Sequence, residues 1–423
     1  MKPRHAVLVM LLCVAVAKGA AADKKSLPVS YFERKVDNAP AVGAAAEAVA
    51  ASAAATQAAR DKAGLQLFGS NDLGPHHEVV LNQTSRSYFR YGQEVGVRLP
   101  ILGARSLQQQ DIVQASAAEG IARLDFQAAH LQLVGRARSG YVAYWSARQQ
   151  QRVAQGFMRQ LAAQRSAAFA LRKGGFWTSA DALAYSGLRE AAELDLSQAR
   201  VDANNALREL SVVTAAPVGP FVPQEPPYAT CALSPGRVVP TALATDVDLL
   251  KIAVQRAQAT QLAALQRWVG YDANVNLGIL SSIDAPGGLG YALLVGSSIA
   301  LPTHVKSERE DELRLFASRV KEYDLLAEQR RAELTASIQT AIANRIEAEN
   351  QLRRARSNER ATAEALREAQ VRMTYLAPNT LTDVLTRTQT AYQARRDAST
   401  ALSAVLERTN DLLLLAPSAC GNA

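Results

Sequence analysis

Two aspartates, Asp181 and Asp383, stand 202 residues apart in matching contexts, SADAL and LTDVL. In the first turn of a helix, an aspartate accepts hydrogen bonds from free backbone N–H groups and is favoured by the helix dipole. The sequence therefore favours helix capping for both aspartates.

The other polar residues form no recognisable catalytic set. His76 and His77 are adjacent in an expected strand and so point to opposite faces, and with His130 and His304 they show no metal-ligand spacing. No Ser/His/Asp set, paired carboxylate or glycine-rich phosphate loop stands in a suitable context. We therefore expect no catalytic residues, no metal site and no cofactor, and we do not expect an enzyme.

Residues 1–22 have the three parts of a secretory signal, with basic Lys2 and Arg4, an apolar run at 6–17 and alanines at 20–22. The apolar run is too short to span a bilayer. Cys13 follows Met-Leu-Leu, which lacks the small residues of a lipidation site, so a lipid anchor is not expected. These features predict an exported protein.

The formal net charge of +8 comes from arginines scattered among glutamate, aspartate and glutamine. A nucleic-acid footprint would cluster its positive charge on one face or stripe, so we expect no nucleic-acid partner. No apolar stretch of 18 residues follows the signal, so no transmembrane helix is expected. A membrane role would require closed β-structure.

The chain contains one large unit twice. Pro100 and Pro302 each close a strand-like run, and they stand at the same 202-residue offset as the two aspartates. The period is too long for a solenoid repeat. Cys231 and Cys420 each follow the end of one unit. In an oxidising compartment they could form a disulfide or stay separate thiols, and both alternatives stay open.

Each unit is expected to contain a helix, a β-hairpin, a very long helix and a second helix. The expected helices are 40–62, 105–172 and 179–213 in the first unit, and 245–267, 306–373 and 381–415 in the second. The hairpins are expected at about 76–100 and about 271–301. The resulting domains are the signal (1–22), the first repeat (23–214), an extended proline-rich linker (215–244), the second repeat (245–416) and a tail (417–423).

Apolar and polar residues alternate along the hairpins, as in Phe89–Leu99 and Tyr271–Ile283. Such alternation over about 10 residues per strand is typical of membrane β-barrels, and half-buried sheets of soluble domains show the same period. The long helices favour the membrane alternative, because each would be on the order of 100 Å long. Four strands cannot seal a pore alone. The fold class expected is mainly α with a membrane β-barrel portion, in which three chains complete a 12-stranded barrel.

The chain resembles outer-membrane efflux proteins of the TolC type over nearly all of the sequence after the signal. The matching features are the duplication, the prolines in LPILG (99–103) and ALPTH (300–304), and the turn GFWTSADAL with Gly175 and Asp181. The second turn, APNTLTDVL, has Pro378 and keeps Asp383, but has Ala377 in place of glycine.

The resemblance implies a homotrimeric exit duct, surrounded by outer-membrane lipid and extending as a helical barrel into the periplasm. Its partners would be a periplasmic adaptor and an inner-membrane pump. In the family, an acidic ring at the periplasmic gate can select cations, and Asp383 matches its first acid. The second acid is Thr386 here, which puts a double ring in doubt.

The compact length, the short hairpin loops and the Arg-Leu-Pro junction at 98–100 resemble the heavy-metal branch, which serves resistance-nodulation-division (RND) pumps. Drug efflux and type I secretion through the same kind of duct are alternatives. A periplasmic adaptor or a structural coiled coil belongs to a different class of function. The two equivalent units with strands before each long helix argue against both.

Overall fold

The computed structural model describes residues 25–78, 86–174, 178–230, 235–284, 288–300, 305–376 and 381–417. Several features expected from the sequence lie outside these residues: the signal, Gly175, Cys231, Pro302, Pro378 and Cys420. The chain divides into two compact units. The sheet-bearing unit comprises 41–130 and 239–337, and the helical unit comprises the rest.

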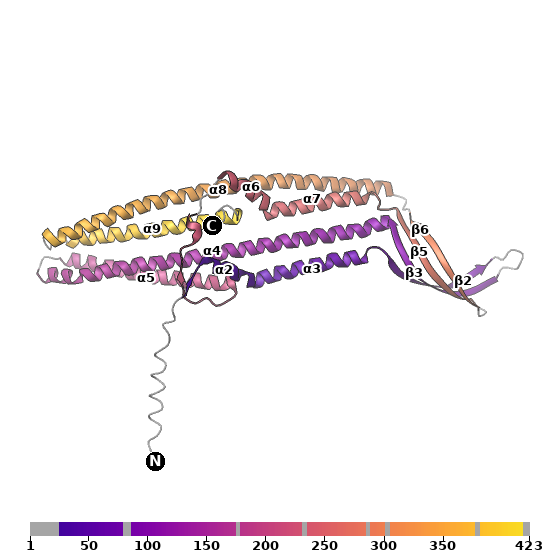
Figure 1. Ribbon diagram of the computed structural model, residues 1–423, viewed down its shortest axis with the longest axis horizontal. Coiled ribbons are helices and arrows are strands. Elements are labelled where there is room, and N and C mark those ends of the chain that lie inside the picture. Colours follow the sequence, from indigo (N-terminus) through magenta and orange to yellow (C-terminus); the bar gives the residue numbers. More distant parts are fainter. Residues whose placement is uncertain are drawn as a thin grey trace, which may run out of the picture. The chain divides into compact units, whose positions relative to one another are not determined.

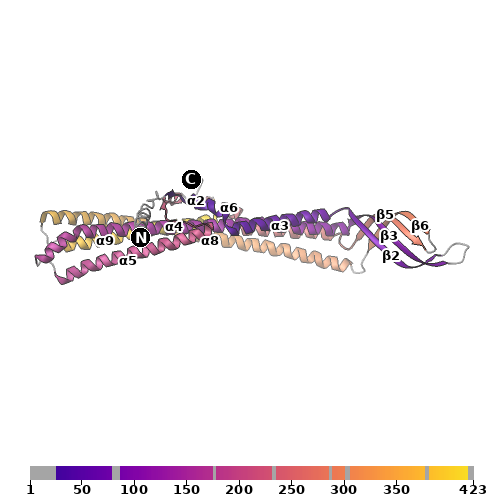
Figure 2. The same cartoon turned by 90° about the horizontal axis from the view of Figure 1, so that it is seen from below.

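The sheet-bearing unit contains one four-stranded antiparallel sheet (Figures 1 and 2). Its strands are β2 (Gln66–Glu78), β3 (Arg86–Leu102), β5 (Asp272–Asp284) and β6 (Gly288–Ala300), in the order β2-β3-β5-β6. The two hairpins therefore lie side by side, with β3 of the first repeat paired to β5 of the second. Gly96 stands opposite Gly278, where an added Cβ would lie 2.5 Å from the carbonyl oxygen of Leu277.

The first hairpin differs from the expected 76–100 because it begins at Gln66. Gly69, Gly74 and Pro75 interrupt the alternation and hide the strand in the sequence. Pro75 is tolerated because β2 is an edge strand, where a missing N–H need not break a ladder. The strand β3 also continues past Pro100 and ends at Leu102, whose φ of +53° marks the change of direction into the next helix.

Most apolar residues of the strands share one face of the sheet, and many of them are exposed there; Phe68 lies on the other face, against Arg98. Across the strands Leu67 is opposite Val97, Val97 opposite Leu277, and Leu277 opposite Val295. Leu67 is 86% exposed and Val295 74% exposed. Side chains such as Arg98 and Asn276, which share a 3.2 Å hydrogen bond, alternate with them. The expected alternation is thus present, with its apolar face uncovered.

The helices of this unit are α3 (Pro40–Lys62), α7 (Val247–Gln266) and the adjoining parts of α4 (Gly103–Lys173) and α8 (Val305–Leu376). Asp246 caps α7 by accepting from the N–H of Leu249 at 2.9 Å, and it also pairs with Arg330 of α8 at 2.8 Å. Burial alone would raise the pKa of Asp246, but these hydrogen bonds outweigh it and hold the pKa below its usual value. Asp246 therefore both caps α7 and links it to α8.

The helical unit contains the remaining parts of α4 and α8 with the return helices α5 (Ser179–Thr214) and α9 (Leu381–Leu415). In Figures 1 and 2, α5 lies beside α4 and α9 beside α8, so each repeat supplies one antiparallel helical pair. Alanine and leucine side chains are buried between the helices, including those of Ala192, Ala199 and Leu210 of α5. Small residues allow such close helix packing.

The expected extended linker is largely ordered against the first repeat. Tyr141 is buried; its hydroxyl donates to the Leu27 carbonyl at 2.7 Å and accepts from the Gln224 N–H at 2.8 Å. Burial raises its pKa to about 12, which keeps the hydroxyl protonated. The short strands β1 (Ser26–Leu27) and β4 (Val222–Pro223) pair beside it, before the 3₁₀ turn η2 (Pro227–Thr230).

The end of the linker departs from the prediction because it is helical. Helix α6 spans Pro235–Thr245. Pro235 is at the first helical position, where its φ suits a helix and its missing N–H would be unpaired in any case; Pro240 lies inside the helix. The remaining short elements are α2 (Val29–Lys35) and η1 (Val36–Asn38), which place Phe32 in an aromatic contact with Phe221 of the linker, 5.1 Å between ring centroids.

Candidate functional site

The first candidate position is the start of α5. Thr178 and Asp181 form a capping box: the Asp181 N–H donates to the Thr178 hydroxyl at 3.2 Å, and the Asp181 carboxylate accepts from the Thr178 N–H at 3.0 Å. The Thr178 hydroxyl also donates to the Asp181 carboxylate at 2.7 Å. This bond and the one from the Thr178 N–H lower the pKa of Asp181, because both are made to its charged form. Asp181 thus satisfies the end of its own helix.

The equivalent position in the second repeat is the start of α9. Leu381, Val384 and Leu385 are buried, whereas Asp383 and Thr386 are exposed on the other side of the helix. Asp383 forms an ion pair with Arg387, 3.3 Å between Oδ1 and Nε. The Thr386 hydroxyl donates to the Thr382 carbonyl at 2.9 Å. The turn before α9 (377–380) lies outside the described residues, so only the carboxylate's pairing is established.

A hydrophobic cluster fixes the start of α9 against the first repeat. Leu381 and Leu385 belong to the same buried cluster as Phe157 and Leu161 of α4 and Ala192 of α5. The two helical pairs therefore meet through apolar side chains beside the candidate aspartate. The exposed side of α9, which carries Asp383 and Arg387, is left for other contacts.

A polar contact further along the seam joins the two repeats directly. Asp195 of α5 accepts a hydrogen bond from the Tyr392 hydroxyl at 2.6 Å and forms an ion pair with Arg396 at 2.7 Å. Both partners are residues of α9. Burial, together with the hydrogen bond to Asp195, raises the pKa of Tyr392. Sequence reasoning missed this contact. The signal was available, because Asp195 and Asp397 have the same 202-residue offset as Asp181 and Asp383.

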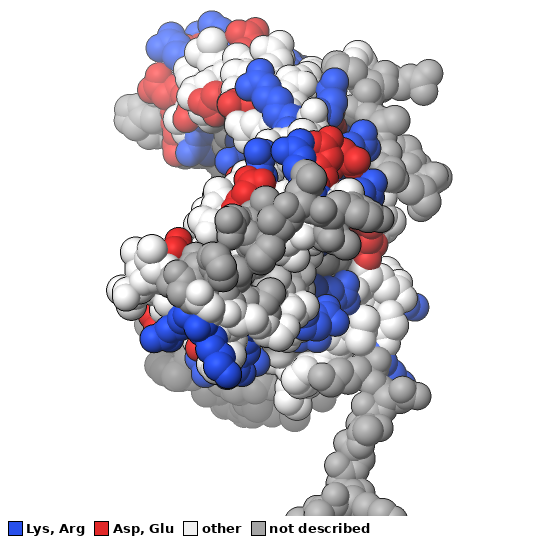
Figure 3. Space-filling model, turned by 90° about the vertical axis from the view of Figure 1, so that its left-hand side faces the viewer, with Lys and Arg blue, Asp and Glu red and all other residues white. Residues whose placement is uncertain are grey.

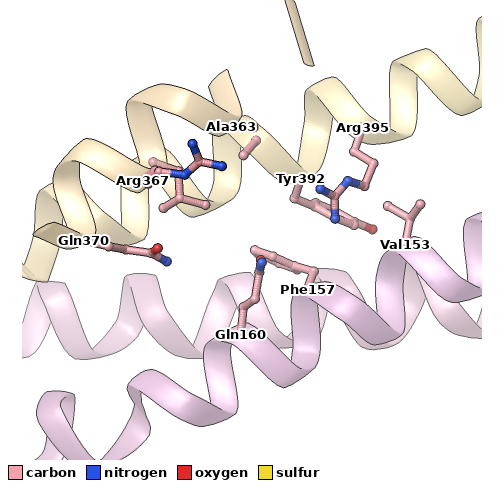
Figure 4. A pocket seen from close by; sticks show the side chains of 10 residues that line it. Val153, Phe157, Gln160, Ala363, Arg367, Gln370, Tyr392 and Arg395 are labelled. Carbon is pink, nitrogen blue, oxygen red and sulfur yellow. The ribbon is translucent and has the colours of Figure 1, made fainter. Parts of the chain in front are cut away.

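Packing next to this contact is incomplete. Tyr392 stacks on Phe157 of α4, with ring centroids 4.2 Å apart and planes 12° from parallel. Beside the stacked rings is a pocket of about 200 Å³. Figure 4 shows Arg367, Gln370 and Arg395 around it on α8 and α9. The pocket is therefore lined by side chains of α4, α8 and α9.

The charges at this end of the helical unit are mixed. Figure 3 looks onto the helix ends and shows basic and acidic side chains interspersed. Consistent with that mixture, Asp383 has a basic neighbour four residues away in the same helix. Within the described ranges, no three His, Cys, Asp or Glu side chains gather as metal ligands would. Over the same residues, no helix is both long and apolar enough to cross a membrane.

Comparison with known proteins shows which solved structures share this fold. No protein-family model matches the chain, and no curated protein sequence is similar to it. Among solved structures, CusC, which forms a transmembrane channel, has a TM-score of 0.72 at 15% identity, over 95% of this chain and 93% of CusC. The outer-membrane channel OprN also has a TM-score of 0.72, at 16% identity, over 92% of this chain and 89% of OprN.

The MtrE outer-membrane channel of Neisseria gonorrhoeae, solved in its open state, has a TM-score of 0.68 at 16% identity, over 92% of this chain and 88% of MtrE. The chain has the fold of the outer-membrane efflux channels. The resemblance to TolC-type proteins is confirmed at the level of fold, including long helices with two β-hairpins. Identities this low establish the channel fold alone, so the activity has to be argued from the residues.

Proposed function

We propose that three copies of this chain form a passive exit duct in the outer membrane, which continues into the periplasm as a helical barrel. In this proposal the signal at 1–22 directs export, 23–214 and 245–416 are the two repeats, 215–244 links them and 417–423 is a tail. The exposed apolar face of the sheet is the observation that carries the proposal.

That face is unusual for a protein in water. Leu67, Leu293 and Ile299 are 86%, 72% and 68% exposed, and they share a continuous surface with Val95 and Leu277. Exposed apolar patches of this kind mark interaction or membrane surfaces. Lipid around the sheet would cover the patch, while the polar side chains of the other face would contact water.

The sheet edges favour an assembly of several copies. Strands β2 and β6 each pair on one side only within the described residues. An unpaired edge cannot face lipid, because its N–H and C=O groups would lack partners. Pairing β6 of one copy with β2 of the next would remove both edges, and three copies would supply 12 strands. Pro100 and Pro302 would then stand near the junction between barrel and helices.

The gate is proposed at the turns of the helical unit, around Asp383, Thr386 and the turn residues Gly175, Asp181 and Pro378. Three copies of Asp383 near a constriction would attract cations. The ion pair with Arg387 reduces that field, so the expected cation preference is modest. Opening would require α9 to part from α5, which strains the contact of Asp195 with Tyr392 and Arg396.

The partners proposed are a periplasmic adaptor, an RND-type inner-membrane pump and outer-membrane lipid. Heavy-metal cations are proposed as cargo, supported by the Arg-Leu-Pro junction and the compact length seen in the sequence. The same duct would also suit drugs or secreted proteins, because the pump chooses the cargo. Deleting the gene should then raise sensitivity to the metal that a neighbouring pump exports, and unchanged sensitivity to metals with raised sensitivity to drugs would reassign the cargo.

The duct itself is tested by fractionation and electrophoresis. We expect the mature protein in the outer membrane, running as a heat-modifiable trimer on gels, and purified trimers should conduct ions in planar bilayers. A soluble periplasmic monomer would contradict the proposal and favour the adaptor or the structural coiled coil. A bridge between Cys231 and Cys420 is proposed separately; thiol labelling of both without reductant would exclude it.

A further inference from the structure

Helix α5 carries an exposed apolar row on the side opposite its buried face. Leu183, Leu194, Val201 and Val212 are 71%, 71%, 49% and 67% exposed. Their spacings of 11, 7 and 11 residues are whole helical turns to within about 20°, so the four side chains lie on one line. The buried Ala192 and Leu210 are half a turn away from this line. We call these four residues the α5 row.

A helix with apolar residues on two opposite sides is typical of an element buried on both sides. One side of α5 packs inside the helical unit, and none of the described residues covers the row. We infer that the α5 row packs against the outward side of α8 in a second copy of this chain. The inference rests on the proposed function, because it needs copies arranged around a common axis.

The second copy offers a matching surface on α8. Ile346 and Val371 are 48% and 51% exposed and stand 25 residues apart, which again brings them onto one line to within about 20°. Exposed positions between them on the same side include Arg353 and Arg360. Within the described part of the chain, neither Arg353 nor Arg360 forms an ion pair. We call Ile346, Arg353, Arg360 and Val371 the α8 row.

Charge favours this pairing of rows. Helix α5 contains six acidic and three basic residues, whereas 353–360 of α8 contain four arginines and one glutamate. Opposite potentials on facing surfaces select partner and register more than they add affinity. The aliphatic stems of Arg353 and Arg360 can also cover leucine or valine while their guanidinium groups reach carboxylates.

The heights of the two rows agree as well. Arg395 of α9 pairs with Glu359 of α8, and the adjacent Arg396 pairs with Asp195 of α5. Glu359 and Asp195 are therefore at nearly the same level along the helices. Because α5 and α8 run in opposite directions, Leu183 comes level with Val371, and Val201 comes level with Arg353.

Rotation about an axis parallel to the helices moves each residue without changing its level. Residues of equal height on different faces therefore meet when copies form a closed ring, and the contact is of the head-to-tail type that generates rings. The α5 row of one copy would meet the α8 row of the next at matched heights along the whole shared length.

Cysteine pairs test this register in trimers of the full-length mature protein. In a background with Cys231→Ser and Cys420→Ser, two matched pairs are made, Val201→Cys with Arg353→Cys and Leu183→Cys with Val371→Cys. The mismatched controls combine the same changes as Val201→Cys with Val371→Cys and Leu183→Cys with Arg353→Cys. Each mismatched pair is separated by 18 residues on α8, about 27 Å along the axis.

We expect a short bis-maleimide to convert most of each matched variant into covalent multimers on denaturing gels, at least tenfold more than in the mismatched variants. Equal cross-linking of all four variants, or none in any, would overturn the inference. Labelling of the α5 row that is blocked only when the adaptor is added would assign the row to that protein instead. Native mass is measured first: absence of trimers contradicts the proposed duct, whereas intact trimers without matched cross-links contradict only this interface.

Discussion

The starts of α5 and α9 are equivalent positions of a repeated unit, but the residue one turn after the aspartate is Tyr185 in α5 and Arg387 in α9. Asp181 bonds to Thr178 and completes its own helix end. Asp383 pairs with Arg387 on an exposed side of α9. A threonine stands three residues before each aspartate, Thr178 and Thr380, but only Asp383 is followed by a basic residue one turn later. Duplication therefore preserves the aspartate and its threonine without preserving the charge beside them.

The largest expected difference is between two glycines of the sheet, one in the inner strand β3 and one in the edge strand β6. A Cβ at Gly96 would lie 2.5 Å and 2.6 Å from backbone atoms of Leu277 and Gly278, whereas one at Gly296 meets no atom within 4 Å. We expect Gly96→Ala to destabilise the sheet by about 3 kcal/mol, because backbone must move to relieve the overlap. Gly296→Ala is the matched control and should have almost no effect.

The yield of heat-modifiable trimers in membranes measures this difference. A Gly96→Ala protein that assembles as well as Gly296→Ala would show that β3 and β5 do not approach each other this closely. The difference between the inner strand and the edge strand would then disappear.

The next contrast is between Asp195 and its repeat equivalent Asp397. Asp195→Ala removes the hydrogen bond from Tyr392 and the ion pair with Arg396, and we expect a loss of roughly 1–2 kcal/mol because the site is only partly shielded from water. Asp397 is exposed, so Asp397→Ala should be nearly neutral.

Thermal unfolding of purified protein gives the stability change, and planar bilayers give the conductance. If the contact holds the helical pairs together at the gate, Asp195→Ala should also open more often. Equal melting temperatures and conductances for the two variants would remove Asp195 from any role in joining the repeats.

A smaller effect is expected from the capping box. Thr178→Ala should cost about 1 kcal/mol, the usual effect of losing an N-cap hydroxyl, and Thr386→Ala is the control within the other repeat. Because the pKa of Asp181 is lowered in the folded protein, its contribution is present above the pKa of an unfolded aspartate, about 4. That contribution is lost as the pH falls through the lower folded value.

Amide hydrogen exchange in the first turn of α5 measures the loss of the capping box directly. Protection should fall in Thr178→Ala and should weaken in the native protein under acid conditions. Protection that is independent of both the hydroxyl and pH would show that the turn is held by other contacts.

The smallest expected effect is on ion selectivity. If Arg387 offsets the field of Asp383, Arg387→Ala should increase the preference for cations and Asp383→Ala should decrease it. An exposed pair contributes little, about 0.4 kcal/mol or a twofold change in permeability ratio. Reversal potentials in bilayers under a salt gradient measure both variants. A change of the same sign in both variants would contradict the idea that Arg387 offsets the field of Asp383.

The periodic parts of the fold were predictable from the residues, and the contacts between the repeats were not. Helix α4 spans Gly103–Lys173 against the expected 105–172, because 71 residues without a break leave a clear pattern. The start of β2 was hidden by Gly74 and Pro75, which read as turn residues until the sheet shows that β2 is an edge strand. Local pattern does not encode position in a sheet.

The candidate site shows the same division. Asp181 and Asp383 were identified from their context, and their partners Thr178 and Arg387 are close in sequence. The contact of Asp195 with Tyr392 joins residues 197 apart, and it depends on how two helical pairs meet. Sequence reasoning could mark Asp195 as a repeated aspartate but could not find its partner, because that partner is set by tertiary packing.

The pairing of β3 with β5 also sets the earliest time at which the sheet can be completed during synthesis. Leu99 finds its neighbour Val275 only after 176 more residues have been synthesised, which takes roughly 10–35 s at ordinary ribosome speeds. During that interval the first hairpin has an unpaired strand edge and an exposed apolar face. The sheet therefore closes only after most of the second repeat's first helix and hairpin has been made, so its two halves form at well-separated times.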